Sequence, residues 1–338
     1  MAKPTIIVIG AGVAGLTCAL ELADRGLDVE VVERSHVLGE GSCSWMAGGM
    51  LAPWCERATT EPEVAELGAP SIAWWAERFP ETVRQGSLVV AQPRDLPDLT
   101  RFAERTERFD WLDADGIAAL EPDLSGRFRR ALVFPDEAHL DPRRALAALA
   151  KHLQEQGVAI RFGVELAPQD ARADIVVDCR GLAARDALPD LRGVRGEMVV
   201  VRSSDVSLQR PVRMLHPRMP LYIVPRGNGL FMIGATMIES ERRGPVSVRS
   251  AVELLNAAYA LHPAFGEAEI VELGADLRPA FPDNLPAVRR GGRVLHANGL
   301  FRHGFLLAPA LARRTAEAVL SMLQPETKHA DLSQRRRA

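Results

Sequence analysis

The chain has 338 residues, of which 47% are hydrophobic and 25% charged, and its formal net charge is −3. These values are ordinary for a soluble globular protein of one large or two interleaved domains, and they exclude a disordered or fibrous chain. The weakly acidic balance provides no broad basic surface, so we expect no nucleic-acid partner. No segment is apolar for long enough to cross a bilayer, and the four cysteines form no CxxC pair. We therefore expect no membrane partner, no metal site and a reduced, cytoplasmic setting.

The first predicted elements form a βαβ unit. Residues 5–9 (TIIVI) are a continuous apolar run, which is typical of a strand buried on both faces of a parallel sheet. A helix is expected over 13–25 and is ended by Gly26, and residues 28–33 (DVEVVE) predict a second strand. This order of elements is a common start of a nucleotide-binding domain.

The turn between the first strand and the helix carries the motif GxGxxG, as GAGVAG at residues 10–15. Gly10 permits the tight turn, Gly12 lets a pyrophosphate approach the backbone, and Gly15 lets the helix pack on the strand. The helix N-terminus attracts phosphate charge. Glu33, at the end of the second strand, is placed to bind ribose hydroxyls and disfavours NADP. These features predict a dinucleotide site without separating FAD from NAD.

The remaining elements alternate between two patterns. A strand and a polar helical stretch after residue 86 indicate an inserted second domain, residues 141–178 return to an α/β pattern, and residues after 196 indicate antiparallel strands. Helices are expected at 61–79, 95–109, 141–156, 248–261 and 305–323, strands at 87–91, 159–162, 173–178, 197–201, 221–225, 230–234 and 268–273, and a loop at 277–279.

Several separate motifs resemble one family. Residues 44–53 (SWMAGGMLAP) resemble the flavin-contacting stretch of the D-amino-acid oxidase (DAO) superfamily, and within it the glycine oxidases of thiamine biosynthesis (ThiO). The resemblance continues in the same order and spacing at 131–142 (ALVFPDEAHLDP), 222–226 (YIVPR), 233–237 (IGATM), 277–279 (LRP) and 301–309 (FRHGFLLAP). It implies FAD as the cofactor, bound non-covalently.

The resemblance also implies the fold and the domains. We expect an α/β protein with a Rossmann-type FAD-binding domain on a parallel sheet, interleaved with an antiparallel-sheet substrate domain, as in the glutathione-reductase-like DAO fold. The FAD-binding domain is assigned to residues 1–85, 140–192 and 274–323, the substrate domain to 86–139 and 193–273, and a disordered tail to 324–338.

The resemblance assigns residues to the cofactor in addition to the three motif glycines. They come from the first helix, the end of the second strand, the segment after residue 42 and the segment before the last helix. They are Val13, Ala14, Glu33, Arg34, Cys43, Ser44, Gly48, Gly49, Met50, Val164, Leu300, Phe301, Arg302, His303, Gly304, Phe305 and Leu306.

By the same resemblance Arg278 and Arg302 face the substrate, with Tyr222 and Met237 beside them. A guanidinium can hold an amino-acid carboxylate by two parallel hydrogen bonds, so Arg278 is our first choice as anchor, and the Tyr222 hydroxyl can donate to the same group. Arg302 precedes the final helix, whose positive end can stabilise negative charge on the reduced flavin.

Two positions depart from the family pattern. Leu300 stands where we expect histidine, and His303 where we expect asparagine. His303 is either a hydrogen-bond partner behind the site or a packed loop histidine, and both interpretations stay open. The substrate contacts near these two residues stay open as well.

The implied reaction is the oxidative deamination of glycine or a similar small amino acid. Hydride passes from Cα to flavin N5, an imino acid forms, and O2 reoxidises the flavin to give H2O2. The imine either hydrolyses or enters thiazole formation with a thiazole synthase as partner. The alternatives are a D-amino-acid or sarcosine oxidase, a dehydrogenase acting on another N-substituted amine, a tRNA-modifying FAD oxidoreductase, and an idle flavin-binding protein. A homo-oligomer stays open.

Overall fold

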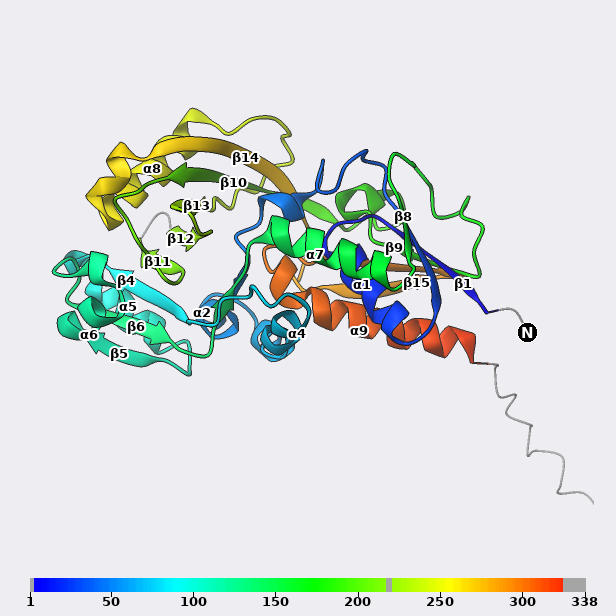
Figure 1. Ribbon diagram of the computed structural model, residues 1–338, viewed down its shortest axis with the longest axis horizontal. Helices are drawn as coiled ribbons and strands as arrows, with labels where there is room; N and C mark the ends of the chain where they lie inside the picture. Colours follow the sequence, from blue (N-terminus) through cyan, green and yellow to red (C-terminus); the bar gives the residue numbers. More distant parts are fainter. Residues whose placement is uncertain (1–2, 217–220, 325–338) are drawn as a thin grey trace, which may run out of the picture.

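The computed structural model describes residues 3–216 and 221–324, and two large sheets occupy its opposite ends (Figure 1). Within these residues, one sheet has six strands in the order β15-β16-β9-β1-β2-β8. The other has eight strands in the order β14-β10-β13-β12-β11-β4-β6-β5, and β3 pairs with β7 in a small third sheet. The predicted tail after residue 324 lies outside the described residues.

The six-stranded sheet contains the predicted βαβ unit. Its strands are parallel except for β15, which pairs antiparallel with β16. Helix α1 packs directly against the turn after β1 because Gly15 has no side chain. A Cβ on Gly15 would lie only 1.7 Å from the Gly10 carbonyl oxygen. The elements are β1 Thr5–Ile9, α1 Val13–Asp24, β2 Asp28–Val32, α7 Pro142–Glu155, β8 Ala159–Arg161, β9 Ile175–Asp178, β15 Ala287–Gly291, β16 Val294–Asn298 and α9 Gly304–Leu323.

The eight-stranded sheet is mainly antiparallel, with one parallel pair between β11 and β4. Helix α8 packs against β10, β12 and β13. The elements are β4 Ser87–Ala91, β5 Asp110–Asp113, β6 Arg130–Phe134, β10 Arg192–Arg202, β11 Val212–Leu215, β12 Leu221–Pro225, β13 Leu230–Gly234, α8 Val248–Leu261 and β14 Glu269–Ala280.

Strand β14 is longer than the sequence predicts. The segment 277–279, expected as a loop, lies inside β14, which pairs with β10 from Arg192 opposite Ala280 to Arg202 opposite Glu269. Pro279 fits inside this strand because β14 is the edge of its sheet, where the missing N–H of Pro279 costs no ladder bond. The predicted domain boundary at 273/274 falls within this strand, and the domain division itself stays a prediction.

Two predicted helices are divided or shortened. The pattern over 61–79 is two helices separated by Ala69 and Pro70, and the pattern over 95–109 ends at Ala103. No helix of the described residues is both long and apolar enough to span a membrane. The shorter elements are η1 Cys43–Met46, β3 Met50–Leu51, α2 Pro53–Arg57, α3 Pro62–Gly68, α4 Ser71–Arg78, η2 Pro93–Asp95, α5 Leu96–Ala103, α6 Ala114–Leu120, η3 Pro122–Leu124, β7 Ala138–His139, η4 Gly181–Asp186 and η5 Pro263–Glu267.

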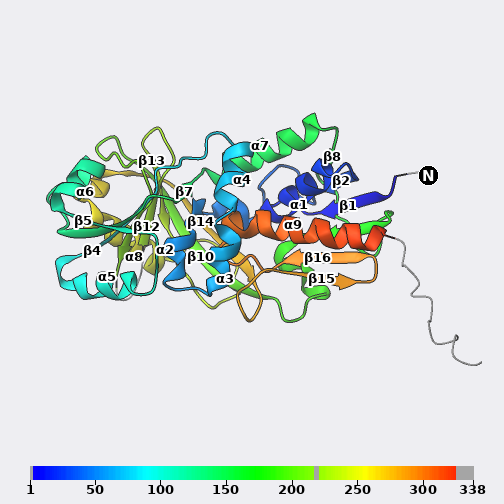
Figure 2. The ribbon, with the colours of Figure 1, turned by 90° about the horizontal axis from the view of Figure 1, so that it is seen from below.

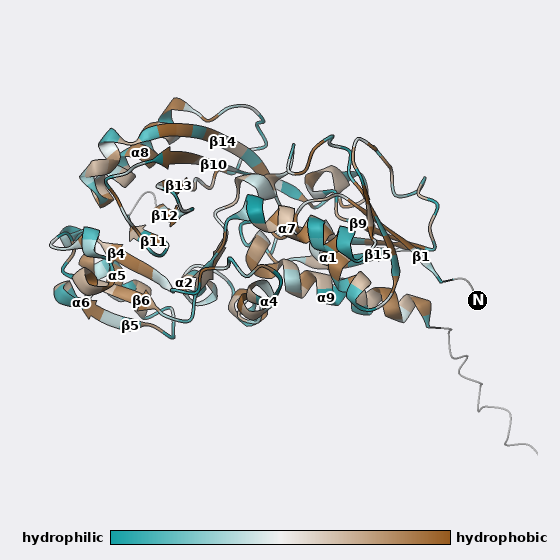
Figure 3. Cartoon of the chain, in the orientation of Figure 1, coloured by the Kyte–Doolittle hydropathy of each residue, from teal (hydrophilic) through white to brown (hydrophobic). Residues whose placement is uncertain are grey.

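Helix α9 lies along the six-stranded sheet, with α3 and α4 against it (Figure 2). Pro309 lies inside α9 and cannot donate a hydrogen bond to the carbonyl four residues earlier, that of Phe305. The indole Nε1 of the fully buried Trp75 on α4 donates to this carbonyl instead, at 2.8 Å. The hydrogen bond from Trp75 fixes the start of α9. Figure 3 shows that the sheet strands on which α9 packs are apolar.

Candidate functional site

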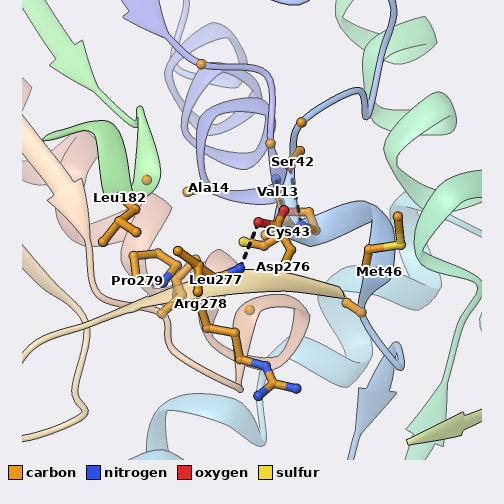
Figure 4. A pocket seen from close by; sticks show the side chains of 18 of the residues that line it. Val13, Ala14, Ser42, Cys43, Met46, Leu182, Asp276, Leu277, Arg278 and Pro279 are labelled. Atoms are coloured by element: carbon orange, nitrogen blue, oxygen red, sulfur yellow. Dashed lines mark hydrogen bonds between the residues drawn. The ribbon is translucent and has the colours of Figure 1, made fainter. Parts of the chain in front are cut away.

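A single cavity runs between the two sheets, from the turn after β1 to the inner face of β10, β12 and β14. Figure 4 shows one of its walls, where β14 passes close to the segment of Ser42 and Cys43. Its lining includes most of the predicted residues: Gly10, Gly12, Val13, Ala14, Glu33, Arg34, Cys43, Ser44, Gly48, Val164, Tyr222, Arg278, Leu300, Phe301, Arg302, Gly304 and Phe305.

The turn at one end of the cavity has the geometry of a phosphate-binding loop. Gly10 has φ of 105°, and a Cβ there would lie 2.6 Å from the Cys179 carbonyl oxygen. The Glu33 carboxylate is held at this turn, because its Oε2 accepts from the backbone N–H of Ala11 at 2.7 Å. The N-terminus of α1 opens into the cavity, and the N–H of Val13 donates to Ser44 Oγ at 3.1 Å.

Six predicted residues lie elsewhere in the described structure. Gly15 and Gly49 serve close backbone packing, since a Cβ on Gly49 would lie 2.1 Å from the Leu140 carbonyl oxygen. Met50 and Leu306 pack in hydrophobic clusters, and His303 is buried as the residue before α9. Met237 is 57% exposed and does not line the cavity.

Arg278 lies on the part of the cavity wall that β14 forms. Its Nη1 donates to the Thr236 carbonyl oxygen at 3.0 Å, and it forms no ion pair with any described residue. Burial lowers the pKa of this guanidinium and raises the pKa of the neighbouring Tyr222 hydroxyl, which stays protonated at neutral pH. Gly48 leaves room for the Tyr222 ring, because a Cβ there would lie 3.0 Å from Cε2.

Arg302 belongs to a cluster of charged side chains, with Glu56 and Arg213, that the sequence did not predict. Its Nη2 lies 2.8 Å from Glu56 Oε2, and Glu56 Oε1 lies 3.5 Å from Nη1 of the buried Arg213. Burial opposes the charge on Glu56, but Arg302 and Arg213 outweigh it and lower the pKa of Glu56 to about 2. Burial also lowers the pKa of His303 to about 4, so its neutral ring accepts from Arg302 Nε at 3.2 Å.

The sequence also missed Gly196 and Asp276 on the cavity wall. One signal for Asp276 was available, because residues two apart on a strand share a face and Asp276 stands two before Arg278. The mistaken loop at 277–279 concealed it. Gly196 lies inside a strand, where a glycine often marks a close approach of another group. No local pattern pointed to Glu56 or Arg213, which α2 and β11 contribute from opposite parts of the chain.

Comparison with known proteins decides the family. The DAO family model, described as FAD dependent oxidoreductase, matches residues 5–318. The chain belongs to this family. It is 57% identical to a Rhizobium etli protein named thiamine biosynthesis oxidoreductase ThiO, over 96% of this chain and 99% of that protein.

Two further relatives bear on fold and organisation. The crystal structure of glycine oxidase from Geobacillus kaustophilus superimposes with a TM-score of 0.79 at 25% identity, covering 99% of this chain and 100% of that one. The bifunctional protein ThiO/ThiG of Synechocystis is 26% identical over 98% of this chain, which spans 54% of its length. The predicted DAO-type fold, the family and FAD as cofactor are confirmed.

The residues present fit FAD. The glycine turn lets a pyrophosphate approach the backbone closely. The Glu33 carboxylate lies beside this turn, where it could bind the hydroxyls of a ribose. The same cavity continues from Glu33 to Arg278 and Arg302, so it can hold a dinucleotide whose second ring system lies between the sheets. The individual residue contacts with the cofactor stay predictions.

Proposed function

We propose that this protein uses FAD to oxidise glycine, or an amino acid of similar size, at its C–N bond. The observation that carries the proposal is Arg278, a half-buried guanidinium on the cavity wall with no carboxylate partner among the described residues. A charge that is partly removed from water and lacks a counter-charge is unfavourable, and a substrate carboxylate would offset this cost through two parallel hydrogen bonds. The glycine oxidase fold and the 57% identity to ThiO support glycine as the substrate.

The chain's own groups bind and orient the substrate. Arg278 holds the carboxylate, and the protonated Tyr222 hydroxyl donates to the same group. Bound FAD supplies the acceptor of the two electrons that leave the substrate. Arg302 and the N-terminus of α9 keep positive charge at the neighbouring wall, and Glu56 fixes the position of Arg302. Apolar residues such as Met232 and Ala235 line the wall near Tyr222 and help to exclude water.

Further parts of the proposal concern partners and setting. O2 is proposed as the final electron acceptor, with H2O2 as its product. A thiazole synthase is proposed as the recipient of the imine, because the Synechocystis relative joins ThiO and ThiG in one chain. A cytoplasmic location is proposed from the four unpaired cysteines, all within the described residues. A homo-oligomer stays an open prediction.

The test is anaerobic reduction of the protein-bound flavin by glycine, sarcosine and D-amino acids, followed by its absorption. We expect glycine to bleach the flavin and to yield H2O2 once air is admitted. Arg278→Ala should raise the glycine concentration needed by at least about 100-fold, since a charge-assisted bidentate contact is lost. Arg202→Ala, an exposed arginine of the same sheet, should behave as wild type. If none of these amines bleaches the flavin, the amino-acid proposal is wrong.

A further inference from the structure

Gly196 is a glycine in the interior of a long strand, and its backbone does not require a glycine. It belongs to β10, pairs with Asp276 on β14, and has no positive φ. A glycine inside a strand weakens the strand, because it contributes no packing and loses more backbone entropy. The space beside Gly196, rather than its conformation, must therefore account for it.

The group that fills this space is the guanidinium of Arg278. A Cβ on Gly196 would lie 2.2 Å from Nη2, 2.3 Å from Cζ and 2.6 Å from Nη1. All three distances are below 3.0 Å, a separation that real Cβ atoms essentially never show. Val194 is opposite Arg278, so Gly196 and Arg278 are diagonal neighbours across the two strands. The guanidinium thus lies directly against the main chain of Gly196.

Thr236 fixes the same guanidinium from another side. Its carbonyl oxygen accepts from Arg278 Nη1 at 3.0 Å. Thr236 is itself tied to β10, because its Oγ1 accepts from the Glu197 N–H at 2.9 Å and its N–H donates to the Glu197 carbonyl oxygen at 3.1 Å. The guanidinium therefore rests on two parts of the backbone that cannot easily move apart.

We propose that Gly196 is a positioning residue for carboxylate recognition. Its missing side chain lets the Arg278 guanidinium lie against β10, and this leaves the cavity in front of the guanidinium open for a small carboxylate substrate. With any side chain at 196, the guanidinium has to move outward, into the space that the substrate needs. The inference rests on the proposed role of Arg278 as the carboxylate anchor.

The clash predicts a specific defect, because only the end of a flexible side chain has to give way. Gly196→Ala leaves the pairing of β10 intact, whereas alanine at Gly15 or Gly49 would meet backbone atoms. Relieving a contact of 2.2 Å to an ordinary separation moves the guanidinium by about 1 Å or more, a displacement that can cost roughly 100-fold in rate. Recognition should fail while the fold and the flavin stay.

The experiment is a double-mutant cycle on the FAD-loaded protein, with acetate as a carboxylate that cannot be oxidised. The wild type, Gly196→Ala, Arg278→Ala and the double variant are titrated with acetate, and the flavin absorption reports Kd. We expect Gly196→Ala to weaken acetate about 10- to 100-fold, to raise KM for glycine more than it lowers kcat, and to leave unfolding unchanged. Added to Arg278→Ala, it should cause no further weakening, because its effect requires the guanidinium.

The control variant is Gly193→Ala, on the same strand but facing the other side of the sheet. It puts a Cβ 3.0 Å from Leu182 Cδ2 and should bind acetate as the wild type does. Acetate binding unchanged in Gly196→Ala overturns the inference, and so does an equal loss in the Arg278→Ala background. If acetate leaves the wild-type spectrum unchanged, a crystal structure of Gly196→Ala decides, and a guanidinium within about 0.5 Å of its wild-type position overturns the inference.

The same cycle separates this inference from the proposed function. If no amine reduces the flavin but Gly196→Ala still displaces the guanidinium, the function fails while the positioning role stands. If glycine reduces the flavin and Gly196→Ala changes neither KM nor the acetate Kd, the function stands while the positioning role fails.

Discussion

Replacing Glu56 by glutamine tests the cluster that holds Arg302 beside the cavity. The carboxylate lies between two guanidiniums, at 2.8 Å from Arg302 and 3.5 Å from Arg213. Its own side chain is 13% exposed and that of Arg213 is 6% exposed. The glutamine keeps the shape but removes the charge, so Arg213 loses its only ion-pair partner among the described residues. Among residues 3–216 and 221–324, the other side-chain hydrogen bond of Arg213 is to Cys55 Sγ at 3.7 Å.

The expected size of the effect follows from the pKa of Glu56. Folding lowers this pKa from 4.5 to about 2, which corresponds to about 3 kcal/mol at about 1.4 kcal/mol for each pKa unit. Removing one partner of a buried ion pair costs about 3 to 5 kcal/mol in other proteins, which is consistent with this value. Because the folded pKa is the lower one, the contribution is fully present above pH 4.5 and is lost as the pH falls towards 2.

Urea unfolding of the FAD-loaded protein, followed by flavin fluorescence, measures this difference. At pH 7 we expect the Glu56→Gln variant to lose about 3 kcal/mol, and at pH 3 the gap to the wild type should narrow. Glu269→Gln is the matched control, because its ion pair with Arg202 is solvent-exposed and should contribute less than about 1 kcal/mol. A variant at Glu56 that is no less stable than this control would refute the argument.

Two further predictions concern the turn between β1 and α1 and the start of α9. Gly15→Ala should yield colourless protein that does not take up FAD in a fluorescence titration, because its Cβ would lie 1.7 Å from the Gly10 carbonyl oxygen. Gly291→Ala, with its nearest neighbour at 3.6 Å, should keep the flavin. Trp75→Phe should cost about 1 to 3 kcal/mol of unfolding free energy, since the Phe305 carbonyl oxygen loses its donor. Pro309→Ala restores a helical N–H and should recover part of this loss; equal stability of the single and double variants would contradict the assignment.

Some features of this protein follow from short stretches of sequence. The strand at residues 5–9, the turn at 10–15 and the carboxylate at Glu33 are defined by apolar runs, glycine spacing and one acidic side chain. Each depends on interactions within about thirty residues, so local rules predict them. The family motifs extend this reach, because each is a short segment for which the resemblance predicts a contact with the cofactor or the substrate.

Other features were decided only by tertiary structure. The length of β14 depends on its pairing with β10. Because of this pairing, residues 277–279 form part of the strand and not the expected loop, and the Arg278 guanidinium lies beside Gly196. The Glu56 cluster joins side chains from three distant segments, and its charges are perturbed only because packing removes them from water. Strand ends, close approaches and buried ion pairs depend on partners far away in sequence, so composition and periodicity cannot predict them.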